Sequence, residues 1–134
     1  MTAIDPAASR IQSAAELGAE SFATKMANSS LDAAIDVWLK RVAQRKYTPT
    51  QRARLLKAVE RGTAAETVEI QLTRAALLRA VGLDEGPAAS AAAAAGATYA
   101  EIGAVLGISG QGVGQKVRAY RDRSAEGTRS GGLS

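Results

Sequence analysis

The chain has 134 residues, the length of one ordinary domain, and 17 lysines and arginines against 13 aspartates and glutamates give it a formal net charge of +4. It contains no histidine and no cysteine, which excludes disulfides, Ser-His and Cys-His nucleophile pairs and the usual ligands of a structural zinc site. Because no apolar stretch approaches the roughly 20 residues that span a bilayer, and no secretory signal is visible, we expect a small cytoplasmic helical protein without a membrane partner.

The first predicted helix begins at Pro6, a residue that suits the first helical position, and runs toward Ala27. It is rich in alanine and poor in large apolar side chains. The run Asn28-Ser29-Ser30 then predicts the end of this helix and the N-cap of a second one.

The second predicted helix covers residues 31–45 and carries a single apolar stripe. Large apolar side chains recur at steps of four, three, one and three, which places them on one face of an α-helix. We expect these side chains to pack in the hydrophobic core or to form a contact between the two subunits of a dimer. The stripe consists of Leu31, Ile35, Trp38, Leu39 and Val42.

Two further helices are predicted before residue 83. Thr48-Pro49 has the pattern of an N-cap and a first helical residue, and the helix it opens runs to Gly62. Thr63 and Glu66 have the spacing of a capping box, which predicts a helix that ends at Gly82. The pattern leaves open whether Gly62 ends one helix or is tolerated inside a longer one.

The following segments are a linker at 84–86, an alanine-rich helix at 88–95 and a C-terminal stretch, 124–134, with three glycines and no apolar face. We expect the last stretch to be disordered. No run of residues has the alternation of a β-strand, so the predicted fold class is all-α.

Residues 98–117 carry the most informative pattern. Thr98 and Glu101 form a capping box, and Gly107 ends the short helix that follows. Ser109 then suits the N-cap of the next helix. Gly103 lies in the middle of the first helix, where a missing side chain allows the second helix to pack closely. Two helices joined by a short glycine-containing turn are typical of a helix-turn-helix.

The run Gly96–Gly103 followed by Leu106-Gly107-Ile108-Ser109 resembles the helix-turn-helix of bacterial sigma-factor region 4 and related small regulators, especially those of high-GC bacteria. The resemblance covers Pro87–Arg121, about a quarter of the chain. It implies a three-helix domain over residues 87–123. Residues 1–83 resemble no known family, and the helices predicted there are expected to form a helical bundle. The resemblance also implies DNA contacts by the second helix at Ser109, Gly110, Gln111, Gln115 and Lys116.

Chemistry around the motif is compatible with double-stranded DNA. Glutamine can pair with adenine in the major groove, and the helix start at Ser109 can bind a phosphate. Thr98 and Tyr99 are further candidates for phosphate contacts. Four positive charges follow within eight residues, opposed by Asp122 alone: Lys116, Arg118, Arg121 and Arg123.

The glycines of the second helix depart from the family pattern, which usually has arginine, alanine or a polar residue there. Gly110, Gly112 and Gly114 supply no side chain that could read a base. A glycine inside a helix costs roughly 0.8–1 kcal/mol relative to alanine. Two expectations remain open: a helix that is ordered on DNA, and binding with little sequence preference.

A second basic group consists of Arg41, Arg45, Lys46, Arg52 and Arg54 around Tyr47. It is either the surface of two helix ends or a second patch that contacts phosphates. Carboxylates are scattered, and no pair has a supporting metal ligand or phosphate-binding glycine loop. We therefore expect no active site, no metal and no cofactor.

The sequence favours a DNA-binding transcriptional regulator of a bacterial chromosome, phage or plasmid, associated with the nucleoid. A homodimer is expected, because one helix-turn-helix contacts few base pairs. Two alternatives stay open. One is an architectural or DNA-processing adaptor in packaging or partition, and the other is a protein–protein module that docks a partner, with residues 1–82 as a further surface for a protein partner.

Overall fold

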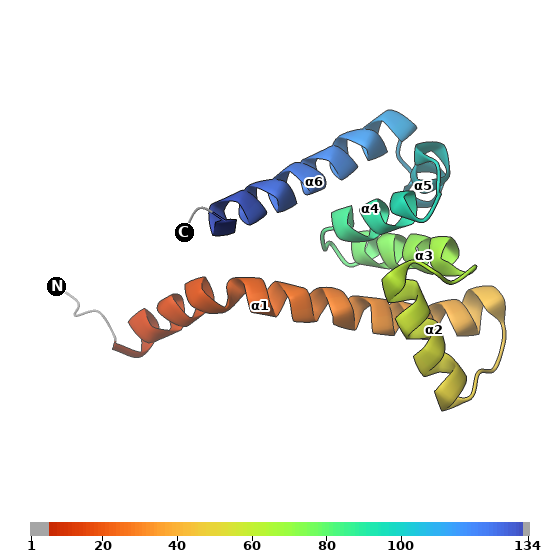
Figure 1. Cartoon of the computed structure of the whole chain (residues 1–134), viewed down its shortest axis with the longest axis horizontal. Helices are drawn as coiled ribbons and strands as arrows, with labels where there is room; N and C mark the ends of the chain where they lie inside the picture. Colours follow the sequence, from red (N-terminus) through yellow and green to blue (C-terminus); the bar gives the residue numbers. More distant parts are fainter. Residues whose placement is uncertain (1–5, 133–134) are drawn as a thin grey trace.

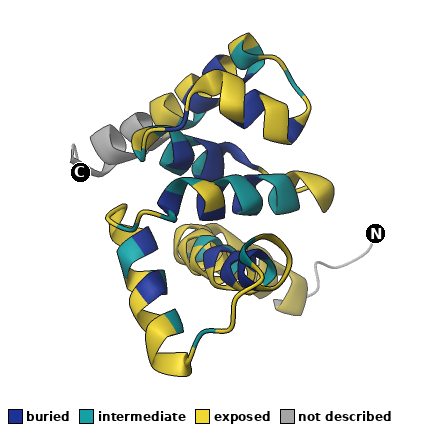
Figure 2. Cartoon of the chain, turned by 90° about the vertical axis from the view of Figure 1, so that its right-hand side faces the viewer, coloured by how far each residue is buried: buried dark blue, intermediate teal, exposed yellow. Residues whose placement is uncertain are grey.

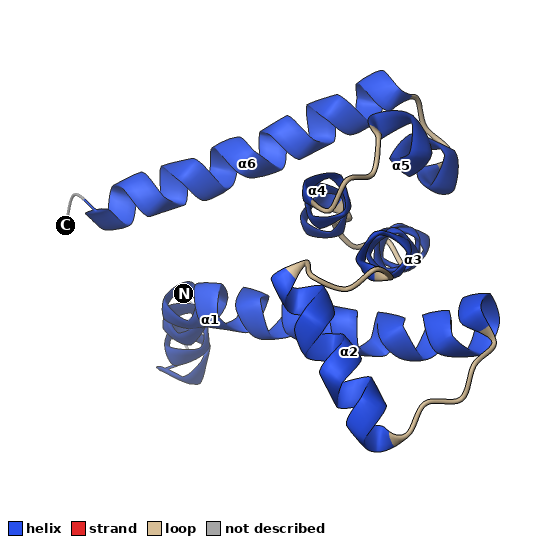
Figure 3. Cartoon of the chain, turned by 45° about the vertical axis from the view of Figure 1, so that its right-hand side comes forward, coloured by secondary structure: helices blue, strands red, loops and turns tan. Residues whose placement is uncertain are grey.

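The computed structural model describes residues 6–132, and the side chains of residues 7–123. Within this range the chain is built from α-helices and one π-helical segment, without a strand (Figure 3). The predicted all-α fold is confirmed. The elements are α1 (Pro6–Val37), η1 (Trp38–Ala43), α2 (Pro49–Arg61), α3 (Thr67–Ala80), α4 (Gly86–Ala94), α5 (Tyr99–Leu106) and α6 (Gly110–Gly132).

The helices form a stack in which each one packs mainly on the next (Figure 1). The second half of α1 lies against α3, α3 lies against α4, and α4 and α5 contact α6. Helix α2 lies beside α1 at the end of the stack away from α6. The first half of α1 extends beyond the stack, and its residues from 7 to 26 are exposed apart from the half-buried Gly18.

Helix α1 is continuous through residues 28–30, so the predicted helix end and N-cap at this run are wrong. The Ser30 hydroxyl donates to the carbonyl of Ala27 at 2.7 Å instead of capping a new helix. It also accepts a hydrogen bond at 2.8 Å from Nε of Arg74 in α3. Adding residues to a helix that is already formed is easier than starting a new one, and these contacts hold Ser30 inside it.

The second predicted helix does not keep its α-helical spacing to residue 45. From Trp38 to Ala43 the chain forms a π-helical segment, which ends at Gln44 in the left-handed region with φ 53°. The wider turn changes which residues share a face. As a result Val42 is rotated away from the stripe and is 51% exposed.

The other four residues of the predicted stripe form the core between α1, α2 and α3. Leu31, Ile35, Trp38 and Leu39 pack with Leu55, Val59 and Ile70. These four side chains are buried inside their own chain, and Figure 2 shows buried segments on the helices of this core. Because they leave no exposed surface, they cannot form the predicted dimer contact, and the core alternative holds for these four residues.

Local signals around α2 are partly confirmed. Thr48 is the N-cap, and the side chain of Gln51 completes a capping box. Gly62 ends the helix in the left-handed region at φ 72°, which settles the open question about a break. The predicted capping box at Thr63 is not formed, because the Thr63 hydroxyl donates to Ala58 and the next helix begins only at Thr67.

The second core joins α3 to α4, α5 and α6, so the chain does not divide at the predicted linker. Ala75 of α3 is buried with Ala88, Ala92, Ile102 and Val113 from the three helices that follow. The linker prediction at 84–86 is therefore wrong: Glu85 and Gly86 are buried, and Gly86 already belongs to α4. The predicted boundary at residue 83 also falls inside a packed unit of four helices.

Helix α6 continues to Gly132, through most of the stretch 124–134 that was expected to be disordered. Extension of an existing helix needs no new nucleus, and the predicted boundary at residue 123 is wrong for the backbone, because α6 passes through it. Among the described helices, none is both long enough and apolar enough to cross a bilayer.

Candidate nucleic-acid interface

The α5–turn–α6 unit begins with the predicted capping box. The Thr98 hydroxyl accepts from the backbone N–H of Glu101, and the Glu101 carboxylate accepts from the backbone N–H of Thr98, both at 3.1 Å. These hydrogen bonds, first the one from the Thr98 backbone, lower the pKa of Glu101. The carboxylate is exposed and charged at neutral pH, and the helix start is fixed.

The turn between α5 and α6 has three residues, 107–109. Gly107 ends α5 in the left-handed region at φ 74°, and the backbone N–H of Ile108 donates to the carbonyl of Gly103 at 3.0 Å. The side chain of Ile108 is half-buried against the second core. The predicted role of Gly107 in ending the helix is confirmed, and Ile108 anchors the turn to the second core.

The start of α6 is capped as the sequence predicted. The Ser109 hydroxyl accepts from the backbone N–H of Gly112 at 3.0 Å. The carbonyl of Ser109 accepts from Val113, the first buried side chain of the helix. The Ser109 hydroxyl thus accepts a hydrogen bond within the chain, and its O–H still points to no acceptor in the described residues and can donate to a phosphate.

The N-terminal end of α5 lies directly against α6, and glycines make this approach close. A Cβ at Gly114 would lie 3.2 Å from the ring of Tyr99, and a Cβ at Gly110 would lie 3.5 Å from the backbone of Ala100. The close packing of α6 on the start of α5 therefore explains why glycine occupies positions 110 and 114, which the sequence alone did not show. The two glycines bring Thr98 and Tyr99, the expected phosphate contacts, beside the first turns of α6.

The outer face of α6 carries the predicted base-reading residues. Gln111, Gln115 and Arg118 are exposed at steps of four and three, on the side opposite the buried Val113 and Val117. Arg121 is also exposed. No ion pair joins Arg118 or Arg121 to a residue whose side chain is described.

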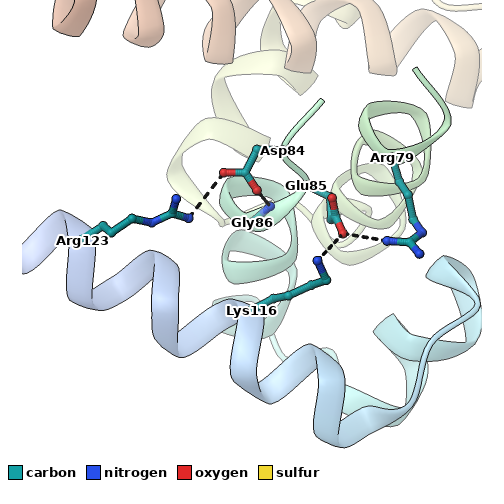
Figure 4. A network of polar contacts seen from close by, with 6 residues as sticks. All are labelled: Arg79, Asp84, Glu85, Gly86, Lys116 and Arg123. Carbon is teal, nitrogen blue, oxygen red and sulfur yellow. Dashed lines mark hydrogen bonds and ion pairs between the residues drawn. The ribbon is translucent and has the colours of Figure 1, made fainter. Parts of the chain in front are cut away.

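Lys116 points the other way, toward the body of the protein (Figure 4). Its ammonium lies 3.2 Å from the Glu85 carboxylate, which also accepts from Arg79 at 3.1 Å. The Glu85 side chain is only 8% exposed. Burial raises the pKa of Glu85, but its backbone N–H, Lys116 and Arg79 together outweigh burial, so the pKa is lowered overall. Lys116 is thus held by Glu85 rather than presented with Gln111.

Glu85 and its two partners, Arg79 and Lys116, form a group that we call the Glu85 cluster. The sequence did not predict it, because residues 84–86 had only the pattern of a linker. Glu85 lies between α3 and α6, so it joins Arg79 and Lys116 from opposite sides (Figure 4). Beside it, Asp84 accepts from the Gly86 backbone at 2.9 Å and lies 3.5 Å from Arg123. The signal available in the sequence was the position of Glu85 directly before Gly86-Pro87, a pattern that suits a helix start.

The second basic group is only partly brought together. Arg45, Lys46 and Arg54 border a shallow hollow beside the half-buried Tyr47. Arg52 faces α1 instead, where it forms ion pairs with Asp32 at 2.9 Å and with Asp36 at 2.8 Å. One of the five predicted cations is therefore engaged in holding α2 against α1.

Among the described side chains, no group of three carboxylates, histidines or cysteines could hold a metal ion. Comparison of the chain with protein-family models, with characterised proteins and with solved structures finds no match.

Proposed function

We propose that this protein binds double-stranded DNA through the α5–turn–α6 unit, with the outer face of α6 in the major groove, and acts as a transcriptional regulator. The observation that carries the proposal is the exposed row of Gln111, Gln115 and Arg118, whose side chains make no hydrogen bond or ion pair with the described residues. Side chains of this kind read base edges and contact phosphates.

The arrangement at the N-terminal ends of α5 and α6 supports the same proposal. Tyr99 lies against α6 at Gly114, and Thr98 precedes it. A duplex contacted by α6 would therefore have the start of α5 beside its backbone, where hydroxyl groups can donate to phosphates. Lys116 is excluded from the proposed contact set, because Glu85 holds it.

Few side chains lie on the proposed reading face of α6, which favours the alternative role of an architectural or DNA-processing adaptor. Gly110, Gly112 and Gly114 contribute no side chain, and Asp122 adds a negative charge to the row. An architectural or DNA-processing adaptor that depends on phosphate contacts needs few base readers. A footprint separates the two roles, because a regulator protects defined sites and an adaptor does not.

The test compares two double variants that remove the same charge. Arg118→Ala with Arg121→Ala changes the proposed interface, and Lys57→Ala with Arg61→Ala changes exposed cations of α2, at the other end of the stack. Binding of a 30-base-pair duplex (about three turns) is followed by fluorescence anisotropy at several salt concentrations.

We expect only the α6 variant to weaken binding. If both arginines contact phosphates, the negative slope of log K against log salt should become shallower by about 1.8 in the α6 variant. Equal losses for the two variants would instead mean that net charge alone governs binding. An α6 variant that binds like the unchanged protein would remove α6 from the interface.

A further inference from the structure

The first half of α1 carries an apolar stripe that no other side chain among residues 7–123 covers. Ile11, Ala15, Gly18, Phe22 and Met26 follow one another at steps of four, three, four and four, which places them on one face of the helix. Ile11 is 68% exposed and Phe22 is 66% exposed. Apolar side chains repeated on one exposed helix face indicate an interface.

The stripe runs into an apolar groove between α1 and the end of α3. The groove has a volume of about 790 Å³, and Phe22, Met26 and Val37 line its α1 side. Leu77 and Val81 line the other side. Stripe and groove therefore form one continuous apolar surface along α1.

The length of this surface indicates the kind of partner. From Ile11 to Val37 the helix rises about 39 Å, at 1.5 Å per residue. Only another elongated element, such as a helix, can cover a surface of that length. A specific interface buries roughly 800 Å² on each partner, so a helix that covers this surface must contact both the stripe and the groove walls.

We propose that a second copy of this chain covers the stripe, with the two α1 helices antiparallel and a two-fold axis between Gly18 and Ala19. In this register Ile11 faces Met26 of the other copy, and Ala15 faces Phe22. The large side chains of Ile11 and Met26 thus contact each other, and the largest side chain, Phe22, packs on the small Ala15. A two-fold interface needs such a self-complementary surface.

Gly18 supports this register. A Cβ at this position would meet nothing within 4 Å, so the packing of a single chain gives no reason for a glycine. A glycine inside a helix lowers its stability relative to alanine. At the axis of a helix pair, however, a residue without a side chain lets the two helices approach closely.

The proposal adds an interaction surface and does not depend on DNA binding, because the stripe lies on α1 and the proposed DNA contacts lie on α5 and α6. A dimer formed through α1 would hold two α6 helices in one particle. The proposed function gains two half-sites from it, yet the dimer is measured without DNA, so the two proposals succeed or fail separately.

The first test uses sedimentation velocity of the full chain at micromolar concentration without DNA. Phe22→Glu places a charge on the stripe. The matched control is Leu17→Glu, because Leu17 is 85% exposed but lies about 140° around the helix from the middle of the stripe. We expect the unchanged chain and the Leu17 variant to sediment at twice the chain mass of 13.8 kDa, and the Phe22 variant to sediment as a monomer.

A cysteine experiment tests the orientation, and the chain contains no cysteine of its own. Ile11→Cys and Met26→Cys chains are mixed and oxidised. The antiparallel pair predicts a disulfide between the two different chains and little linkage within each single preparation. Circular dichroism checks that both variants keep the helical content of the unchanged chain.

Three results would overturn the proposal. One is an unchanged chain that sediments as a monomer. Another is a Phe22 variant that remains a dimer like the Leu17 control. The third is an Ile11→Cys preparation that links to itself, which would mean a parallel pair.

Discussion

The backbone at Gly103 approaches the carbonyl oxygen of Ile108 so closely that a Cβ on residue 103 would lie 2.5 Å from it. The same Cβ would lie 3.2 and 3.3 Å from backbone atoms of Ser109 and Gly110. These neighbours are backbone atoms and cannot rotate aside as a flexible side chain can. The position of the turn on α5 therefore requires a glycine at residue 103.

Gly103→Ala should lower the free energy of unfolding by about 1–3 kcal/mol, the usual cost of overpacking, although alanine is the better helix former. The matched control is Gly110→Ala in the same unit, where the new Cβ would make ordinary contacts at 3.5 Å. Urea unfolding followed by circular dichroism measures both. Equal stabilities for the two variants would contradict the tight turn.

The Glu85 cluster predicts a pH dependence of stability. The folded protein lowers the pKa of Glu85 from its ordinary value of 4.5, so this group stabilises the fold above that value. The contribution is lost as the pH falls below about 4.5 through the folded pKa. Glu85→Gln should therefore show a smaller loss of unfolding free energy between pH 6 and pH 3 (roughly the carboxylate range) than the unchanged chain. Parallel curves for the two proteins would argue against the cluster.

Lys116 and Arg118 should differ in what they affect, although they are two residues apart. Lys116→Met breaks the contact with the buried Glu85 and should lower thermal stability. Arg118→Met removes an exposed cation and should leave the melting temperature nearly unchanged while weakening DNA binding. Melting curves and anisotropy titrations on both variants measure the two effects. A Lys116 variant with normal stability and reduced affinity would reverse the assignment.

Trp38 offers a test of the first core. Its indole N–H is buried and has no hydrogen-bond partner among the described residues. Trp38→Phe removes this unpaired donor and keeps most of the apolar contact, so it should cost less than about 2 kcal/mol. Trp38→Ala should cost about 3–5 kcal/mol. Similar losses for both variants would mean that the N–H has a partner, and denaturant unfolding decides.

Capping signals were predictable where the chain offered no stronger competitor. Thr98 and Glu101 form their box because α5 follows at once. Thr63 has the same spacing to Glu66, yet the end of α2 takes over its backbone and its hydroxyl, both of which donate to Ala58. A local pattern of four residues does not contain this competition, which comes from the preceding helix.

Packing between distant segments was the part that the sequence could not provide. Ser30 stays inside α1 because Arg74, 44 residues later, donates to its hydroxyl. Lys116 looked like a free cation in the sequence, since Glu85 comes 31 positions earlier (116 minus 85) and only the fold brings them together. In contrast, Gly103 and Gly107 act within their own unit, so their roles could be read from spacing alone.

The central claim is that α6 of the folded protein contacts duplex DNA. The most direct measurement is a titration of the full chain against genomic DNA fragments at two salt concentrations, with and without unlabelled competitor. We predict that discrete fragments survive competition and that their affinity falls steeply with salt, as several phosphate contacts require. The absence of binding to any fragment at low salt would contradict the account.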